Sequence, residues 1–283
     1  MRARIRDTEL YFDVEGCELA IATSHIQQKP VFFVIHGGPG VDHTTCRPVL
    51  SPLSEIAQLV YFDHRGHGRS ARGNSETYTL DNNVEDMEAL RQYLGLERIG
   101  LLGFSYGGMV ALTYASRYPN HVSQLIPVVT AADSRFLTLA QAKLAREGTP
   151  EQQVIAQLLW DGQFASEQQL QEYFQLLGPL YSLTFDLDKS MDAWRRVIFN
   201  PEAINQAFGG FLRTYDIRAA LPQISVPTLV IGAEKDWICP PQFSREIAQA
   251  IPNARLEIVP NSGHSIRADA PKILLELVSN FMQ

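Results

Sequence analysis

Short, unbroken apolar runs recur along this chain at intervals that suit the strands of a buried sheet. Six such runs stand out, at residues 31–35, 59–62, 99–102, 125–129, 228–231 and 256–259. Parallel strands that are covered by helices on both faces read as continuous runs of Val, Ile, Leu and Phe, because neither face meets water. The pattern therefore predicts a mostly parallel sheet that is buried between other elements.

Amphipathic segments of helical length lie between these runs. Each of them is bounded by Pro, Gly, Asn or Asp, which are the residue types that start and stop helices. They span residues 48–58, 82–94, 106–117, 241–250 and 271–281. Strands that alternate with helices in this way indicate an α/β doubly wound sheet.

The first part of the chain follows another pattern. Residues 4–12 and 17–23 alternate polar and apolar side chains, and residues 14–16 separate the two segments. Alternation of this kind is typical of half-buried strands, so we expect an antiparallel strand pair with its turn at residues 14–16.

The strand pattern is interrupted between residues 132 and 215, where Gln, Leu, Phe, Tyr and Trp dominate. Residues 149–152 and 165–168 each resemble the start of a helix. In both, a small polar residue or proline is followed by an acid, which is favoured at the positive end of a helix dipole. We therefore expect a cap of two or more helices, inserted into the core. The predicted core comprises residues 1–131 and 216–283, and the predicted cap comprises residues 132–215.

One apolar run leads directly into a sharp turn with a serine at its tip. Gly103, Ser105 and Gly107 form a G-x-S-x-G pattern. The two glycines leave room for a strand and a helix to approach each other around a strained serine backbone. A plain glycine-rich turn would show the same letters, but the apolar run before it and the helical segment after it favour a nucleophile elbow. Ser105 is therefore the predicted nucleophile.

A serine hydroxyl is a weak nucleophile that needs a histidine base and an acid to orient the histidine. Asp236 lies just beyond the run 228–231 and precedes an apolar, structured stretch, so it is the predicted acid. Glu234 is the competing acid. His264 lies in a loop of small residues after the last strand run and is the predicted base.

Two backbone N–H groups must also stabilise the oxyanion that forms during acyl transfer. Tyr106, the residue after the nucleophile, supplies the first. The second is expected from Gly38 in the HGGPG loop that follows the run 31–35, with Gly37 as the alternative. A phosphate cradle is the competing interpretation of this glycine-rich loop, but no Gly-Lys-Ser or Gly-Lys-Thr follows it.

A second polar loop, residues 63–70, follows the run 59–62. We interpret it as mainly structural, with Asp63 and Arg65 pairing and bonding to loop backbones. Its two histidines have only one acid nearby, which is a poor ligand set for a metal, so no metal site is predicted.

Composition and charge narrow the range of partners. The 283 residues carry a formal net charge of -7 with no basic cluster, which argues against a nucleic-acid surface and favours a small substrate. No apolar run is long enough for a membrane span or follows the pattern of a secretory signal. Three widely spaced cysteines without a CxxC pair suit free thiols in a reducing compartment, so a cytoplasmic location is expected.

Taken together in this order, the motifs resemble the α/β-hydrolase fold and, more narrowly, its proline iminopeptidase branch. The most specific parts are HGGPG at 36–40 and DHRGHGRS at 63–70, followed by the elbow at 103–108, Asp236 and His264. The resemblance implies a mostly parallel sheet with an inserted helical cap, the same three triad residues, and no cofactor. Members of this branch remove N-terminal residues, often proline, whereas relatives with the same loops act on amides, esters or lactones.

One position departs from the peptidase pattern. In the peptidases the free amine of the substrate is held by carboxylates, one from the cap and one often just after the triad acid, because a buried ammonium needs a paired charge. Trp237 stands at the second of these places here, where it can stack on a flat or apolar substrate instead. Glu202 is the cap candidate for binding an amine, and the alternatives are Glu147, Glu172, Asp186 and Asp188. Gly37, Trp237 and Glu202 are therefore the predicted substrate-binding residues.

The sequence thus predicts a serine hydrolase that acts on a small molecule or short peptide. Within this class, an aminopeptidase or amidase competes with a carboxylesterase or lactonase. Epoxide hydrolases and dehalogenases of this fold carry an aspartate at the elbow, so Ser105 disfavours both. A small-molecule receptor that kept a hydrolase pocket is the alternative from another class.

Overall fold

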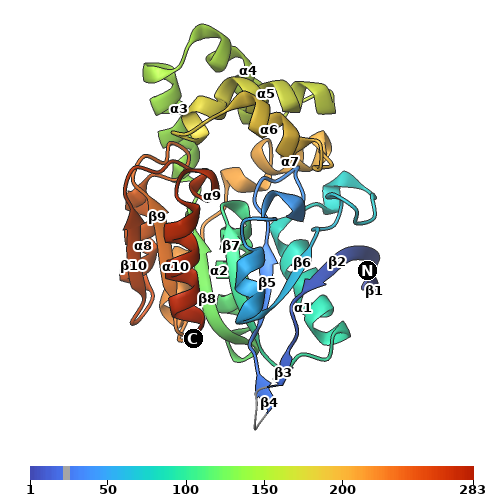
Figure 1. Cartoon of the computed structure of the whole chain (residues 1–283). Coiled ribbons are helices and arrows are strands. Elements are labelled where there is room, and N and C mark those ends of the chain that lie inside the picture. Colours follow the sequence, from blue (N-terminus) through green and yellow to red (C-terminus); the bar gives the residue numbers. More distant parts are fainter. Residues whose placement is uncertain (22–25) are drawn as a thin grey trace.

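The computed structural model describes residues 1–21 and 26–283, which form an eight-stranded sheet with helices on both faces (Figure 1). The strand order is β1-β2-β6-β5-β7-β8-β9-β10. The strands are β1 (Arg2–Ile5), β2 (Thr8–Glu15), β5 (Val31–Ile35), β6 (Gln58–Phe62), β7 (Ile99–Phe104), β8 (Val122–Val128), β9 (Leu229–Ala233) and β10 (Arg255–Val259). Neighbouring strands from β6 to β10 pair in parallel, whereas β1 and β2 form an antiparallel edge. The predicted fold class is confirmed.

Two hydrophobic layers cover the two faces of the sheet. In β5, Phe33 and Ile35 point into one layer, and Phe32 and Val34 point into the other. The first layer is covered by α1 (Leu80–Tyr93), α2 (Tyr106–Arg117) and α8 (Pro241–Ala250). The second is covered by the 3-10 helix η2 (Ser51–Glu55), α9 (Ile266–Asp269) and α10 (Pro271–Met282). Burial on both faces explains why these strands are apolar throughout rather than alternating.

All six predicted runs are strands, with bounds that differ by a few residues at most. The predicted helices at 106–117 and 241–250 match α2 and α8, and those at 82–94 and 271–281 match α1 and α10 closely. The helix predicted at 48–58 was wrong, because this segment holds only the five-residue η2. Pro48 and Pro52 each lack the backbone N–H that an α-helix needs in its interior.

The predicted N-terminal strand pairing was also wrong. The first hairpin pairs β1 with β2 through a turn at Arg6, which has a φ of +48°. Gly16, with a φ of +84°, does not turn the chain back into a hairpin. A Cβ atom there would lie 2.8 Å from the carbonyl oxygen of Ala57, so the glycine allows close approach to the segment before β6. Of the second predicted strand, 17–23, residues 22 and 23 lie outside the described residues.

A two-stranded ribbon follows instead, made of β3 (Leu19–Ile21) and β4 (Ile26–Gln28). The remaining short elements are five 3-10 helices: η1 (His43–Thr45), η3 (Ser75–Thr77), η4 (Pro119–His121), η5 (Phe211–Arg213) and η6 (Arg218–Gln223). Within residues 1–21 and 26–283, no helix has the length and apolar character needed to cross a lipid bilayer.

Five helices between β8 and β9 lie together over one end of the sheet, at the top of Figure 1. They are α3 (Arg135–Glu147), α4 (Pro150–Asp161), α5 (Glu167–Tyr181), α6 (Leu187–Trp194) and α7 (Pro201–Phe208). Both predicted helix starts are present. Thr149 and Gln152 form a capping box at the start of α4, and the Ser166 side chain accepts a hydrogen bond from the Gln169 backbone N–H at the start of α5.

The chain enters and leaves this helical region through two adjacent segments. Asp133 and Asp216 form an isolated antiparallel bridge. The backbone N–H of Ser134 donates to the Tyr215 carbonyl at 2.8 Å, and that of Ile217 donates to the Ala132 carbonyl at 2.9 Å. These hydrogen bonds join the segment that enters the helical region to the segment that leaves it, at the boundary with the sheet.

We expect Gly103→Ala to destabilise the fold strongly. A Cβ atom at Gly103 would lie 2.3 Å from the Gly107 carbonyl oxygen, and a backbone cannot move away as a flexible side chain can. The expected loss of unfolding free energy is about 3 kcal/mol or more, measured by chemical denaturation. Gly73→Ala is the matched control, since nothing lies within 4 Å of the added atom. Equal stability of the two variants would contradict the packing argument.

Candidate active site

Ser105 lies at the tip of the turn between β7 and α2, with φ 54° and ψ -118°. This conformation is rare for a residue with a side chain and costs about 1–3 kcal/mol. The surrounding backbones hold it in place. A Cβ atom at Gly107 would lie 2.2 Å from the Ile35 carbonyl oxygen, so α2 begins in direct contact with the end of β5. The predicted elbow geometry is thus present.

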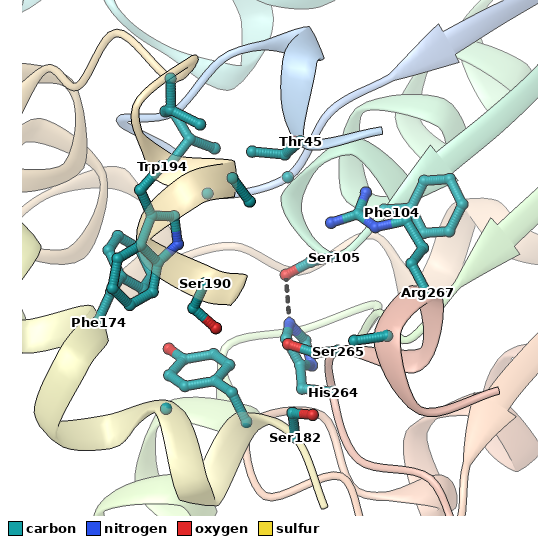
Figure 2. Close-up of a pocket in the computed structure, with 18 of the residues that line it drawn as sticks. Thr45, Phe104, Ser105, Phe174, Ser182, Ser190, Trp194, His264, Ser265 and Arg267 are labelled. Carbon is teal, nitrogen blue, oxygen red and sulfur yellow. Dashed lines mark hydrogen bonds between the residues drawn. The ribbon is translucent and has the colours of Figure 1, made fainter. Parts of the chain in front are cut away.

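The three predicted triad residues come together at the carboxyl ends of their strands. His264 Nε2 lies 2.9 Å from Ser105 Oγ (Figure 2). His264 Nδ1 lies 2.8 Å from Asp236 Oδ2. With Nδ1–H donating to the carboxylate, Nε2 is free to accept the serine proton. The arrangement can activate a serine for attack on a carbonyl carbon.

Asp236 is held by the start of the next segment. Its second carboxylate oxygen accepts the backbone N–H groups of Ile238 at 2.8 Å and Cys239 at 2.9 Å. The competing acid, Glu234, is exposed, pairs with Lys235 at 3.2 Å and accepts the Asn261 backbone N–H. Of the two candidates, only Asp236 contacts His264.

The predicted oxyanion donors lie beside the serine. Gly37, Gly38 and Tyr106 all line the same cavity as Ser105. A Cβ atom at Gly37 would lie 3.1 Å from the Ser105 Cβ, so the loop after β5 approaches the nucleophile closely. The Tyr106 N–H belongs to the first turn of α2, where backbone donors have no partner within the helix. The Tyr106 side chain points away into the core, where its hydroxyl accepts a hydrogen bond from Asn83 at 2.7 Å.

The cavity has a volume of about 680 Å³ and lies between the sheet and the helices α3–α7. Aromatic side chains form much of its wall: Phe104, Phe136, Tyr173, Phe174, Tyr181, Phe185, Trp194, Phe199 and Phe208. Tyr181 also packs edge-on against His264, with ring centroids 5.6 Å apart. A pocket of this size and character suits a small, largely apolar molecule.

Two of the predicted substrate-binding residues lie outside this wall. Trp237 is only 1% exposed and packs behind Tyr181, with ring centroids 5.3 Å apart, while its neighbour Ile238 lines the cavity instead. Glu202 is exposed in the first turn of α7 and is not part of the cavity wall. The structure thus brings neither the Trp237 nor the Glu202 side chain to the cavity wall. Position in the sequence did not reveal which way each side chain points.

Residues 30–271 match the family described as the alpha/beta hydrolase fold. The chain belongs to this family. Over 279 residues it is 29% identical to proline iminopeptidase PfmaB of Pestalotiopsis fici, covering 96% of this chain and 99% of that protein. The hydrolase is thus similar in sequence to a proline iminopeptidase over nearly its whole length.

Solved structures share its fold. The proline iminopeptidase of Mycobacterium smegmatis superposes with a TM-score of 0.77 at 22% identity, covering 100% of this chain and 97% of that one. The enol-lactonase of Burkholderia xenovorans LB400 superposes with a TM-score of 0.73 at 22% identity, covering 100% and 99%. At this identity the likeness shows the fold alone.

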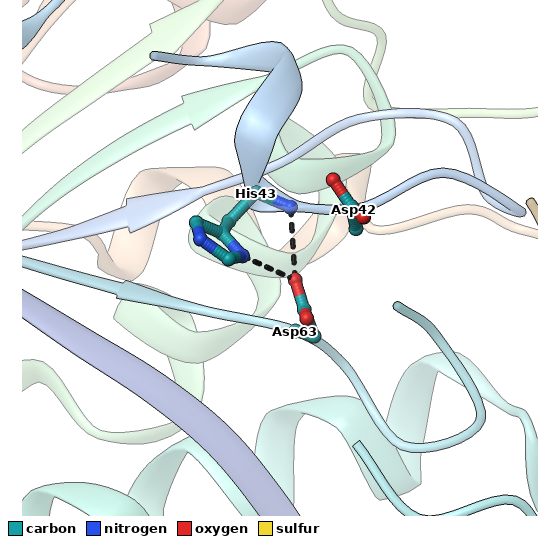
Figure 3. Close-up of side chains that lie close together, drawn as sticks. All are labelled: Asp42, His43 and Asp63. Atoms are coloured by element: carbon teal, nitrogen blue, oxygen red, sulfur yellow. Dashed lines mark hydrogen bonds and ion pairs between the residues drawn. The ribbon is translucent and has the colours of Figure 1, made fainter. Parts of the chain in front are cut away.

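A buried polar network joins the two loops that border the hydrolase site (Figure 3). Asp63 Oδ1 lies 2.7 Å from His43 Nδ1 and accepts the His43 backbone N–H at 2.9 Å, while Oδ2 accepts the Arg69 backbone N–H at 2.8 Å. Burial alone raises the pKa of Asp63, but these hydrogen bonds outweigh it and hold the pKa below the usual range. The predicted partner of Asp63 was wrong: Arg65 pairs with Asp86 at 2.6 Å instead.

Among the described residues, Asp42, His43 and Asp63 form one group whose ligand atoms lie close enough for a metal ion. Their oxygens already have donors, however. Asp42 Oδ1 accepts the Thr44 backbone N–H at 2.9 Å, and Oδ2 accepts Arg69 Nη1 at 3.0 Å and the Ile198 backbone N–H at 2.8 Å. Carboxylates satisfied in this way act as structural acceptors, and we assign the cluster no metal.

Asp42 and Asp269 also tie the cap to the core, a role that no sequence signal indicated. Through the Ile198 N–H, Asp42 binds the segment between α6 and α7 to the loop after β5. Asp269 accepts the backbone N–H of Gly263 at 2.7 Å and the hydroxyl of Ser182 at 2.6 Å. Ser182 follows α5 and Gly263 precedes His264, so one half-buried carboxylate joins the helices between β8 and β9 to the loop that carries His264.

Three histidines pack together under the loop after β5. His36 lies 4.6 Å from His64 and 5.4 Å from His67, measured between ring centroids. Burial lowers the pKa of His67 to about 3 and that of His64 well below its ordinary value. Both rings are therefore neutral at physiological pH and serve as packing.

We expect the free energy of unfolding to fall as the pH drops below about 6.5, before most carboxylates titrate. An unfolded histidine takes up a proton near pH 6.5, whereas the buried rings do not until much lower pH, so protonation favours the unfolded state. Each such histidine contributes about 1.4 kcal/mol per pH unit. His64→Phe should reduce this slope by about one proton between pH 6 and 5, measured by urea denaturation. An unchanged slope would show that His64 is protonated in the folded protein.

Proposed function

We propose that this α/β-hydrolase is a serine hydrolase that cleaves a small ester, amide or lactone through an acyl-enzyme on Ser105. The observation that carries the proposal is the continuous chain from Ser105 Oγ through His264 to Asp236, with contacts of 2.9 and 2.8 Å. A receptor does not need a nucleophile, a base and an orienting acid within hydrogen-bond distance of one another. The contacts between Ser105, His264 and Asp236 therefore favour an enzyme over a receptor.

In the first half of the reaction, Ser105 Oγ attacks the substrate carbonyl while His264 Nε2 takes the serine proton. Asp236 accepts Nδ1–H and stabilises the imidazolium that forms. The backbone N–H groups of Tyr106 and Gly38, which line the same cavity, are the proposed donors that stabilise the oxyanion. His264 then protonates the leaving group as the carbonyl reforms, which leaves an acyl group on Ser105.

In the second half, water replaces the leaving group. His264 takes a proton from the water as it attacks the acyl carbon, and it returns that proton to Ser105 as the acid product departs. The apolar wall from the cap excludes other water, which strengthens the hydrogen bonds at the reacting centre. We propose that residues 132–215 act as the cap that controls entry to this space.

The charges along the cavity bear on the substrate. Among the described residues that line it, Asp186 is the one acid, and it is exposed, caps α6 and pairs with Lys189 at 3.5 Å. A substrate ammonium would therefore find no buried carboxylate to pair with. This observation favours an ester, an amide without a free amine, or a lactone.

An aminopeptidase is the second candidate. The sequence similarity to a proline iminopeptidase over 279 residues favours it. A kinetic panel separates the two: prolyl and other aminoacyl anilides, the same anilides with a blocked amine, short acyl esters, and lactones. If only free-amine anilides are cleaved, the enzyme is a peptidase, and comparable activity on blocked amides or esters excludes that assignment.

Substitutions at the triad should abolish turnover without unfolding the protein. Ser105→Ala removes the nucleophile, and Asp236→Asn keeps the shape but disturbs the tautomer of His264, so kcat should fall about 10⁴-fold in the second variant. The kinetic panel gives the rates, and thermal denaturation checks the fold. Glu234→Gln is the matched control and should keep wild-type rates. Unchanged turnover in Ser105→Ala would rule out the mechanism.

A further inference from the structure

Arg267 is a half-buried cation in the wall of the catalytic cavity, three residues after His264. Within residues 1–21 and 26–283, no carboxylate lies within ion-pair distance of its guanidinium. Its one hydrogen bond is from Nη1 to the Cys46 sulfur at 3.1 Å, and sulfur is a weak acceptor. Most of its five N–H donors are therefore without a strong protein partner.

The guanidinium is nevertheless fixed in position. Its central carbon lies 4.6 Å from the centre of the Phe104 ring, so one face is covered by an aromatic side chain. Phe104 directly precedes Ser105 and is itself only 2% exposed. Figure 2 shows Arg267 against Phe104, with Ser105 and Thr45 nearby in the same close-up. The stacking thus holds a positive charge against the residue that directly precedes the nucleophile, in the wall of the same cavity.

Another arginine of the cavity wall is engaged by acids. Arg47 pairs with Asp13 at 2.6 Å and with Glu15 at 3.3 Å, which satisfies its donors within the protein. Arg267 has the same chemistry and is half-buried in the same cavity wall, but no acid among the described residues pairs with it. Such an arginine is suited to an anion that arrives with the ligand, because the planar guanidinium matches a carboxylate with two parallel hydrogen bonds.

We propose that Arg267 binds a carboxylate of the substrate, so that the preferred substrate is an ester, amide or lactone that carries a free carboxylate. This inference rests on the proposed hydrolase function and adds a substrate class to it. The carboxylate forms a bidentate pair with the guanidinium edge that Phe104 leaves open. The cleaved carbonyl lies at Ser105, and the apolar wall holds the carbon chain between the two groups.

Matched esters test the proposal by turnover. Mono(4-nitrophenyl) esters of glutaric and adipic acid keep a free carboxylate, and their methyl 4-nitrophenyl diesters differ only in masking it. The wild type should show a higher kcat/KM for the half-esters. In Arg267→Gln, the ratio of half-ester to diester should fall about ten- to a hundredfold, since it loses a charge-assisted pair. Arg267→Lys should restore part of the ratio.

Two control variants separate Arg267 from the general charge of the protein. Arg255→Gln removes the same charge from the exposed start of β10 and should keep the wild-type ratio. Arg196→Gln removes another cation from the cavity wall. If Arg196→Gln lowers the ratio as much as Arg267→Gln, the preference comes from the overall field of the cavity and the assignment to Arg267 is overturned.

Binding provides a readout that does not depend on turnover. In the Ser105→Ala background, calorimetry should detect tighter binding of the half-esters than of the diesters, and Arg267→Gln should remove that difference. If the wild type cleaves both esters equally and binding does not discriminate, the carboxylate proposal fails while the hydrolase proposal stands. If binding discriminates but no ester, amide or lactone is cleaved, the hydrolase proposal fails and the anion site stands.

Discussion

The close approach of three backbones around Ser105 is the constraint on which the rest of the site depends. The end of β5, the end of β7 and the start of α2 meet where Gly103 and Gly107 leave no space for a side chain. This contact holds Ser105 at a positive φ and raises its hydroxyl above the sheet edge. Because parallel strands end at the same edge, Asp236 and His264 reach the hydroxyl from later strands without any long or unusual loop.

Two buried carboxylates, Asp42 and Asp63, and the half-buried carboxylate of Asp269 then fix the loops around that edge. Asp63 fastens the loops after β5 and β6 to each other, and Asp42 and Asp269 fasten the cap to both sides of the site. Leaving the buried Asp42 or Asp63 without donors would cost several kcal/mol, so their networks favour a single arrangement of the loops. The positions of the Gly38 N–H and the His264 ring therefore depend on residues that never meet the substrate.

The sequence predicted what depends on local pattern and on chain order. Buried strands, helix caps and the elbow are encoded by neighbouring residues, so Ser105 and the strand ends were predictable, as was the order of acid and base. Contacts between distant segments were not: nothing near Asp42 indicates that it reaches Ile198. Trp237 illustrates the limit. Its position directly after Asp236 does not reveal whether its side chain points toward the cavity. The neighbouring Ile238 lines the cavity instead.

The distribution of charge around the cavity likewise could not be predicted from the sequence. The net charge of -7 describes the whole chain, yet the described cavity wall carries Arg47, Lys189, Arg196 and Arg267 against the single acid Asp186. A buried ammonium would meet no buried acid in this described wall, whereas a carboxylate would meet Arg267, whose guanidinium packs against Phe104 on one face. Since a charge enters a low-dielectric site only with a partner, this distribution of charge supports our proposal of a substrate without a free amine.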